Sequence, residues 1–220
     1  MKEFWILGAG RFGKKAVRDL TGRYPGCRIL VVDQDRTSLE ALKAHRIRVA
    51  AADAVSWLAD NLRPDRPDWI VPMVPVHVAY EWLKIKVLKS HELIPVAVPP
   101  EIFQKIPHPM PSGDDCLFMS HADFICPDNC PEPRNHCTVT GKHRTALFDL
   151  LQILASGNSY QCIVLRSRQL APGVGGFRPV SLLNVMEKAI ASDGPILLST
   201  VCRCHGVMHA FSLRKRLGKS

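Results

Sequence analysis

The cysteines are the residues most suited to chemistry, and most of them lie in the second half of the chain. Cys126, Cys130 and Cys137 follow one another in a C-x3-C-x6-C spacing, within a segment rich in proline. Farther along, a Cys-Arg-Cys-His run follows an apolar segment. Thiolates and imidazoles bind zinc, and thiolates also bind iron–sulfur clusters. The pattern predicts a metal site whose ligands are drawn from Cys126, Cys130, Cys137, Cys202, Cys204 and His205.

Two kinds of metal centre fit this set of ligands. Structural zinc takes four cysteines, or three cysteines and a histidine, in a tetrahedron. Iron–sulfur clusters take cysteine thiolates, and proline can follow a ligand cysteine, as it does after Cys126 and Cys130. An iron–sulfur cluster is the first prediction and zinc the second. Cysteines without metal, or a reducible disulfide between Cys202 and Cys204, stay as further alternatives.

A second chemical motif opens the chain, where an apolar run leads into Gly8-Ala9-Gly10-Arg11-Phe12-Gly13. This is a GxGxxG pattern between a predicted strand and a predicted helix. The first glycine permits a tight turn, the second lets the backbone approach a pyrophosphate, and the third packs the helix on the strand. The free N–H groups and the positive dipole end of the helix then face the phosphates. The motif predicts a dinucleotide-binding site.

Asp33 supports that prediction, because it ends the second apolar run, 20 residues after Gly13. A carboxylate at this position accepts hydrogen bonds from the ribose 2′-hydroxyl, which favours NAD over NADP. A glycine turn that has lost its ligand is the alternative explanation.

These residues also resemble a known family. The run from Phe4 to Gly13, followed by Val31-Val32-Asp33, is similar to the nucleotide-binding N-terminal domain of regulator-of-potassium-conductance (RCK/KTN) proteins. The Arg-Phe pair inside the glycine loop and the Ala52-Asp53-Ala54 turn add to the resemblance, which covers about residues 2–98. It implies a homodimer that binds NAD(H) or another adenine nucleotide and regulates potassium channels or transporters. The nucleotide contacts it implies are Gly8, Gly10, Arg11, Phe12, Gly13, Asp33, Asp53 and Ala54.

Predicted strands and helices alternate along residues 1–100, and these elements would position the glycine motif. Apolar runs predict strands, and apolar residues three or four apart predict helices. A Thr37-Ser38-Leu39-Glu40 capping box predicts the start of the second helix. Such alternation is typical of βαβ units in a parallel, Rossmann-like sheet. The expected strands are residues 3–7, 28–32, 47–51, 69–74 and 93–98, and the expected helices are 11–20, 37 onward, 54–62 and 78–89.

The second half of the chain begins differently. Residues 101–140 are rich in proline and cysteine, which predicts a long loop held by a ligand. Helices are then expected at residues 145–154 and 181–190, and strands at 161–165 and 196–201. We place a domain boundary near residue 100, between a Rossmann-type domain (1–100) and a cysteine-rich α/β region (101–220). Whether the second region extends the first sheet is not determined by this pattern.

Composition limits the remaining possibilities. The chain has 220 residues, of which 46% are hydrophobic and 22% charged, as in an ordinary globular protein. A net charge of +9 suits an anionic cofactor, but the short basic end lacks the aromatics of a nucleic-acid site. No run is long enough to span a membrane, so we expect a cytoplasmic protein with neither membrane insertion nor bound nucleic acid.

The expected function combines both motifs. The sequence predicts a cytoplasmic NAD(H)-binding protein with a cysteine-ligated metal centre that acts in redox sensing or electron transfer. If it is an enzyme, it is an NAD-linked oxidoreductase with a redox partner. The alternative is a non-enzymatic regulatory subunit, in which a nucleotide acts on a homodimer that binds a potassium transporter and the cysteines hold structural zinc.

Overall fold

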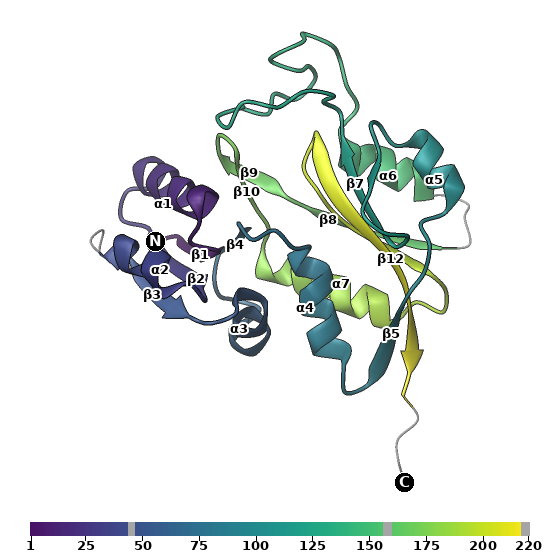
Figure 1. Ribbon diagram of the computed structural model, residues 1–220, viewed down its shortest axis with the longest axis horizontal. Helices are drawn as coiled ribbons and strands as arrows, with labels where there is room; N and C mark the ends of the chain where they lie inside the picture. The colour runs from purple at the N-terminus through teal and green to yellow at the C-terminus, as the bar shows by residue number, and fades with distance from the viewer. Residues whose placement is uncertain (44–46, 156–159, 217–220) are drawn as a thin grey trace. The chain divides into compact units, whose positions relative to one another are not determined.

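The computed structural model describes residues 1–43, 47–155 and 160–216, which belong to two compact units (Figure 1). The first unit comprises Met1–Ile85 and Arg168–Leu183, and the second comprises Lys86–Ser167 and Asn184–Ser220. In the described ranges each unit has its own main sheet, so the two halves of the chain do not extend a single sheet. The predicted α/β class is confirmed, whereas a domain boundary near residue 100 stays a prediction.

The main sheet of the first unit is parallel throughout, with the strand order β3-β2-β1-β4. This is the order of the first half of a Rossmann sheet, in which ligands bind beyond the carboxyl ends of the strands. A helix follows each of the four strands, as the alternating pattern predicts. The elements are β1 (Glu3–Leu7), α1 (Arg11–Arg23), β2 (Arg28–Asp33), α2 (Arg36–Lys43), β3 (Arg48–Ala51), α3 (Ala54–Asn61), β4 (Trp69–Pro72) and α4 (Val78–Val87).

Helix α1 buries one face against this sheet. Gly13, Ala16, Val17 and Leu20 are its buried residues, spaced three or four apart. Phe12 lies four residues before Ala16 and so has the spacing of this apolar face, but its side chain is 50% exposed. Phe12 belongs to the glycine loop at the start of the helix, and the close approach of Gly13 to the sheet turns the preceding side chain outward.

Helix α2 begins one residue earlier than predicted and uses a different cap. Asp35 Oδ1 accepts a hydrogen bond from Thr37 N at 3.0 Å, and its Oδ2 accepts one from Ser38 Oγ at 2.7 Å. The predicted capping box centred on Thr37 is therefore wrong. Glu40 instead pairs with Lys43 within the helix. Aspartate is a strong cap, and its carboxylate offers two acceptors to the free N–H groups of the first turn.

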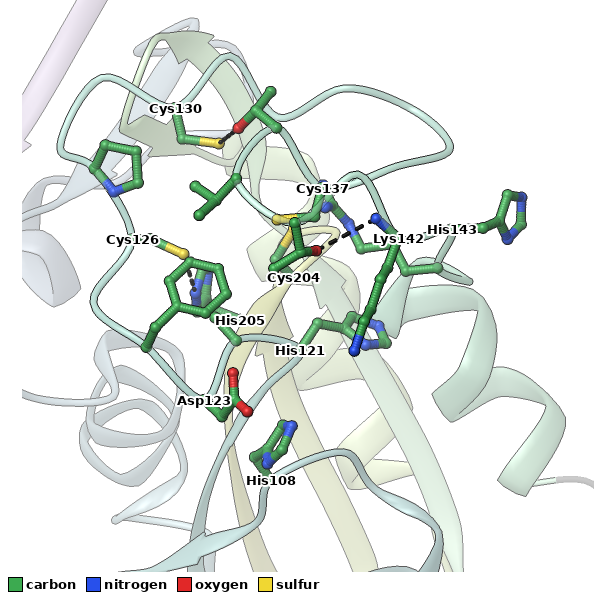
Figure 2. A pocket seen from close by; sticks show the side chains of 17 residues that line it. His108, His121, Asp123, Cys126, Cys130, Cys137, Lys142, His143, Cys204 and His205 are labelled. Carbon is green, nitrogen blue, oxygen red and sulfur yellow. Dashed lines mark hydrogen bonds between the residues drawn. The ribbon is translucent and has the colours of Figure 1, made fainter.

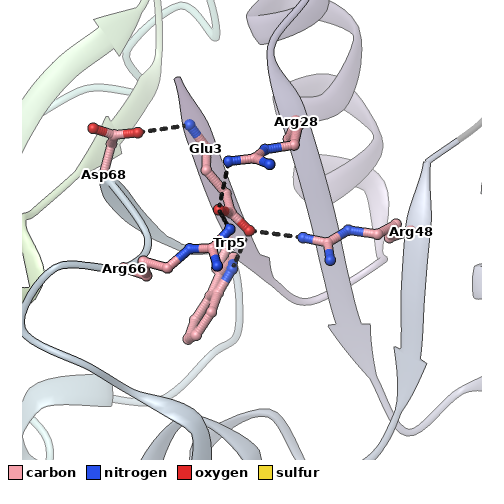
Figure 3. Close-up of polar contacts among 6 residues, drawn as sticks. All are labelled: Glu3, Trp5, Arg28, Arg48, Arg66 and Asp68. Atoms are coloured by element: carbon pink, nitrogen blue, oxygen red, sulfur yellow. Dashed lines mark hydrogen bonds and ion pairs between the residues drawn. The ribbon is translucent and has the colours of Figure 1, made fainter. Parts of the chain in front are cut away.

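Glu3 joins several elements at the edge of the sheet opposite the glycine loop (Figure 3). Its side chain is buried, with residues from three strands and the following loop around it. The donors and ion-pair partners of its carboxylate are Trp5, Arg28, Arg48 and Arg66. Burial raises the pKa of Glu3, but the hydrogen bonds from Trp5 and Arg66 and the charges of Arg66 and Arg48 outweigh burial and lower it.

A hairpin from the second half of the sequence completes the first unit. Its strands, β9 (Arg168–Ala171) and β10 (Val174–Gly176), pair antiparallel. Leu170, Ala171 and Val174 are buried in the same core cluster as Phe4, Ile6 and Leu20. After the hairpin, Ile70 and Phe177 exchange two backbone hydrogen bonds of 2.9 and 3.0 Å, which cover the free edge of β4. Although the segment from Ala171 to Gly176 is rich in glycine, its residues Ala171 and Val174 are part of the core.

The second unit is built on a mixed sheet with the order β6-β7-β12-β11-β8, and β5 also pairs with β12. Strand β5 contradicts the prediction of a fifth parallel strand, because it lies antiparallel to the end of β12. The periodicity of apolar residues predicts a strand, but it does not predict which strand will pair with it. The elements are β5 (His91–Pro95), α5 (Pro100–Lys105), β6 (Met110–Pro111), β7 (Cys116–Ser120), α6 (Leu147–Ala155), β8 (Gln161–Arg166), α7 (Pro179–Ile190), β11 (Ile196–Val201) and β12 (His205–Lys215).

Strand β12 is the longest element that the sequence pattern missed. It runs for 11 residues and occupies the centre of the sheet. Met208 and Ala210 are fully buried, as the alternation of a strand requires, but Gly206 and the basic end of the strand hide that pattern. Among the described residues, no helix is long and apolar enough to cross a membrane.

Candidate functional site

The glycine loop lies at the carboxyl edge of the parallel sheet, directly after β1. Gly8 has a φ of +110°, and a Cβ there would lie 2.6 Å from Met73 O. A Cβ on Gly13 would lie 2.0 Å from Gly8 O. Both positions therefore require glycine, because the loop, the start of α1 and the end of β4 approach each other closely.

Gly10 differs from its two neighbours, since a Cβ placed on it would meet no atom within 4 Å. It caps α1 with an extended backbone and without a side-chain hydrogen bond. The first turn of α1 contains no acidic residue. Space over Gly10, free N–H groups and the positive end of the helix dipole together form a surface suited to an anion.

Asp33 ends β2 beside this loop. Its Oδ2 accepts a hydrogen bond from Ala9 N at 2.6 Å, and its Oδ1 accepts one from Asp35 N at 2.8 Å. The carboxylate thus holds the middle of the glycine loop and keeps lone pairs for a ribose hydroxyl.

Asp53 follows β3 at the same edge and caps α3. Its Oδ1 accepts a hydrogen bond from Ser56 N at 2.8 Å. Hydrogen bonds from the Ser56 backbone and side chain lower the pKa of Asp53, so it is a carboxylate at neutral pH. Arg11 lies 5.2 Å from the centre of the exposed Phe12 ring, whereas Ala54 is buried at the start of α3.

The structure therefore brings the predicted nucleotide-binding residues to one edge. They follow three adjacent strands, β1, β2 and β3, whose carboxyl ends point the same way. Their contacts with a nucleotide remain a prediction. The residues concerned are Gly8, Gly10, Arg11, Phe12, Gly13, Asp33, Asp53 and Ala54.

A second candidate site is a cavity of about 210 Å³ in the second unit, lined by four thiols (Figure 2). Three belong to the long segment between β7 and α6, namely Cys126, Cys130 and Cys137. The fourth is Cys204, in the turn between β11 and β12. Strands β7 and β12 pair here, and His121 N donates to Cys204 O at 2.8 Å, so the pairing brings both segments together.

Two of these thiols have polar partners. Cys126 Sγ lies 3.5 Å from His205 Nε2, and Cys130 Sγ lies 3.7 Å from Thr138 Oγ1. Burial raises the pKa of Cys126, and the nearby sulfurs of Cys130 and Cys137 raise it further. Burial also lowers the pKa of His205, so that its imidazole is neutral at pH 7.

The Cys137 thiol is more acidic than an ordinary cysteine. Hydrogen bonds from the Thr140 backbone and side chain and from the Val139 backbone lower its pKa to about 7. The local turn explains them: Cys137 N donates to Lys142 O, and Gly141 N donates to Cys137 O, both at 2.9 Å. A substantial share of this thiol is therefore thiolate at neutral pH.

Cys202 is placed differently from Cys204, although only one residue separates them. Its sulfur accepts hydrogen bonds from Cys204 N at 3.4 Å and His205 N at 3.3 Å, within the β11–β12 turn. Burial raises the pKa of Cys202 to about 12. It is not one of the residues that line the cavity, so its observed role is to shape the turn.

Two further residues, which no sequence motif indicated, hold the long segment: Glu132 attaches it to that turn, and Arg144 bonds within it. Glu132 Oε1 accepts a hydrogen bond from Arg203 N at 2.6 Å, and Glu132 itself has a φ of +49°. Arg144 lines the cavity and donates to Pro133 O at 3.4 Å. Their position next to the cysteines is the signal that could have drawn attention to them.

The predicted metal ligands are thus only partly brought together. Four of the cysteines and His205 line one cavity, while Cys202 does not. All eight cysteines are free thiols. Within residues 1–43, 47–155 and 160–216, no three histidine, cysteine or acidic side chains converge closely enough to hold a metal ion. Metal binding at these residues remains a prediction.

Comparisons with known proteins give two family matches along the chain. Residues 4–59 match the TrkA-N domain, which confirms the resemblance of the glycine loop to the RCK N-terminal domain. A protein of Archaeoglobus fulgidus, described as "Uncharacterized protein", is 27% identical, and the match covers 93% of this chain and 97% of that protein. No solved structure matches. Residues 76–214 match the family AF_1314_C, described as "Uncharacterized protein, C-terminal domain". The match covers more than half of the 220 residues, so this protein, with its TrkA-N domain, belongs to the AF_1314_C family.

Proposed function

We propose that the protein binds NAD(H) at the glycine loop of the first unit. The observation that carries this proposal is the open surface over Gly10, between two glycines that the fold itself requires. The pyrophosphate lies over Gly10 and the first turn of α1. Asp33 accepts hydrogen bonds from the ribose, and the turn at Asp53 and Ala54 lies beside the adenine. The TrkA-N match over residues 4–59 supports the same assignment.

We further propose a redox role, either redox sensing or electron transfer. The thiol-lined cavity of the second unit favours this role, because thiols and thiolate-bound iron–sulfur clusters are groups through which proteins exchange electrons. If the protein catalyses a reaction, it is an NAD-linked oxidoreductase.

A second candidate is a nucleotide-responsive regulatory subunit of a potassium transporter, acting as a homodimer. The specific observation that favours it is again the TrkA-N match, since the resemblance to RCK proteins implies potassium transport. In this case the cavity holds structural zinc and the nucleotide is bound without turnover.

A substitution at Gly10 tests nucleotide binding without disturbing the fold. A Cβ there meets no protein atom within 4 Å, and a side chain occupies the proposed space of the pyrophosphate, so Gly10→Val is expected to weaken NADH binding at least about tenfold, equal to about 1.4 kcal/mol. Isothermal titration calorimetry with NADH, NAD+, NADPH and ATP measures the affinities.

Gly22→Ala is the matched control. Gly22 lies in the same helix and is equally open, but at the far end from the loop. We expect unchanged NADH affinity in this variant. Wild-type affinity in Gly10→Val, or no NADH binding by the wild-type protein at millimolar concentration, would show that the loop is not a dinucleotide site.

A further inference from the structure

We propose that Cys126, Cys130, Cys137 and Cys204 bind one thiolate-ligated metal centre, and that Cys202 is not a ligand. This inference concerns the second unit and does not depend on nucleotide binding. The redox role proposed above rests on the iron–sulfur form of this centre, because zinc has no redox chemistry. Zinc and an iron–sulfur cluster share the chemistry of four thiolates, and the test below distinguishes them.

The first argument is that four cysteines line one cavity. The chain has eight cysteines, and four of them line a single cavity in the second unit. They come from segments more than 60 residues apart, joined by the pairing of β7 with β12. Ordinary core cysteines are packed among apolar side chains, whereas this cavity is also lined by His121, His205 and Arg144.

The second argument is how the segment between β7 and α6 is held. It has neither helix nor strand between Ser120 and Leu147, yet several polar contacts fix it at its cysteines. Cys130 N donates to Pro127 O at 3.1 Å, and the turn at Cys137 is closed by two hydrogen bonds. The strained backbone of Glu132 is held by its bond to Arg203 N. A long irregular segment with a backbone outlier at such a place is typical of a ligand-binding loop.

The third argument is charge. Four thiolates around a divalent ion leave a net negative charge, which needs compensation where solvent is limited. The guanidinium of Arg144 and the ammonium of Lys142 line the same cavity. His205 Nε2, 3.5 Å from Cys126 Sγ, can donate a hydrogen bond to that thiolate. We therefore assign His205 as a positioning residue rather than as the fourth ligand.

Contacts in the turn between β11 and β12 distinguish Cys202 from Cys204 as the fourth ligand. The backbone N–H groups of Cys204 and His205 donate to the Cys202 sulfur, and His205 Nδ1 lies 3.9 Å from it, so that thiol is held within the turn. Cys204 faces the cavity instead. The thiols line the cavity but do not meet at one point, so we expect the segment between β7 and α6 to close on the metal as the thiols lose their protons.

Metal analysis of the whole chain tests the assignment. The protein is purified without oxygen, and iron, zinc and acid-labile sulfide are measured together with the visible spectrum. We expect either one zinc per chain and no colour, or iron with matching sulfide and thiolate-to-iron absorption. Protein that lacks both, and stays empty after anaerobic incubation with zinc or with iron and sulfide, overturns the proposal.

Single substitutions then identify the fourth ligand. Cys204→Ser is expected to lower the metal content at least tenfold, while Cys202→Ser, the matched control two residues away, keeps it. His205→Gln is expected to keep the metal but shift the spectrum of the iron- or cobalt-loaded protein. Equal loss in Cys202→Ser and Cys204→Ser, or loss in His205→Gln alone, overturns the assignment.

Two readouts separate this proposal from nucleotide binding and from misfolding. Far-ultraviolet circular dichroism shows whether each variant folds, and NADH affinity shows whether the first unit is intact. We expect Cys204→Ser to bind NADH like the wild type, and Gly10→Val to keep its metal. Failure of metal binding with normal NADH binding then counts against the metal site alone.

Discussion

Glu3 shows how one side chain stabilises the amino ends of the strands in a parallel sheet. Its carboxylate is buried, but the three arginines that reach it keep about half of their side-chain surface exposed. Solvent screening therefore weakens each ion pair, and the hydrogen bonds of the buried carboxylate carry much of the effect.

A pH series with Glu3→Gln tests this role. The pKa of Glu3 is lowered by folding, so its charge stabilises the protein above the ordinary value near 4.5, and that stabilisation is lost as the pH falls through the lower, folded value. We expect Glu3→Gln to lower the free energy of unfolding by about 1–3 kcal/mol at neutral pH. The difference between the two proteins should shrink between about pH 5 and about pH 3.

Urea unfolding followed by tryptophan fluorescence measures this difference, since all four tryptophans lie within Met1–Ile85. Glu40→Gln is the control, because Glu40 forms only an exposed pair with Lys43. A gap between wild type and Glu3→Gln that stays constant down to pH 3 would contradict an ionised Glu3 in the folded state.

Asp33 and Asp35 show that carboxylates two residues apart have separate roles. Asp33 holds the glycine loop through Ala9 N, while Asp35 caps α2 through Thr37 N and Ser38 Oγ. The glycine motif therefore depends on an acidic residue for its shape.

At the scale of elements, the β9–β10 hairpin is the part of the first unit that is most distant in sequence. Lys15 Nζ donates to Pro172 O at 2.7 Å, and Tyr24 Oη donates to Leu170 O at 3.1 Å, so two residues of the α1 region bind its backbone. Leu170 is 4% exposed within the core cluster. The hairpin is thus a structural component of the nucleotide-binding unit.

Truncation of Leu170 tests whether the hairpin stabilises this unit. Leu170→Ala removes buried methyl groups and leaves a cavity, so we expect the free energy of unfolding to fall by about 2–5 kcal/mol. Tryptophan fluorescence again reports the first unit selectively.

Val180→Ala is the matched control, because Val180 follows the hairpin in α7 and its side chain is 47% exposed. Its effect is expected to stay within about 0.5 kcal/mol. An unchanged fluorescence transition in Leu170→Ala would mean that the hairpin does not contribute to the stability of the first unit.

At the scale of the whole molecule, the two candidate sites lie in different units, and activity can show whether they act together. A redox protein is expected to oxidise NADH with an artificial electron acceptor, with one NAD+ formed for each pair of electrons transferred. Both Gly10→Val and Cys204→Ser should lower that rate at least tenfold, because each removes one of the two sites.

The regulatory alternative has a different outcome. A regulator is expected to bind NADH without oxidising it and to copurify with a potassium transporter from a membrane extract. Oxidation of NADH at the wild-type rate by Cys204→Ser would show that the thiols are not on the electron path, and it would remove the support for a redox role.

Local patterns in the sequence were sufficient to predict the glycine loop, the position of Asp33 and most elements of the first unit. Their signals act over a few residues: the spacing of glycines, the periodicity of apolar side chains and the position of an acid after a strand. The strands at residues 3–7 and 196–201 match the structure at both ends for this reason. The cysteine spacing likewise indicated three of the four thiols that line the cavity.

Tertiary structure alone decided the partners of these elements. The pairing of β5 with β12, the contact of Phe177 with Ile70 and the approach of His205 to Cys126 join residues about 80 or more positions apart. No local pattern encodes such contacts, because they depend on which edges and faces remain free once the sheets form. The difference between Cys202 and Cys204 has the same origin: two identical side chains in one turn point to different places because backbone N–H groups hold only one of the two sulfurs.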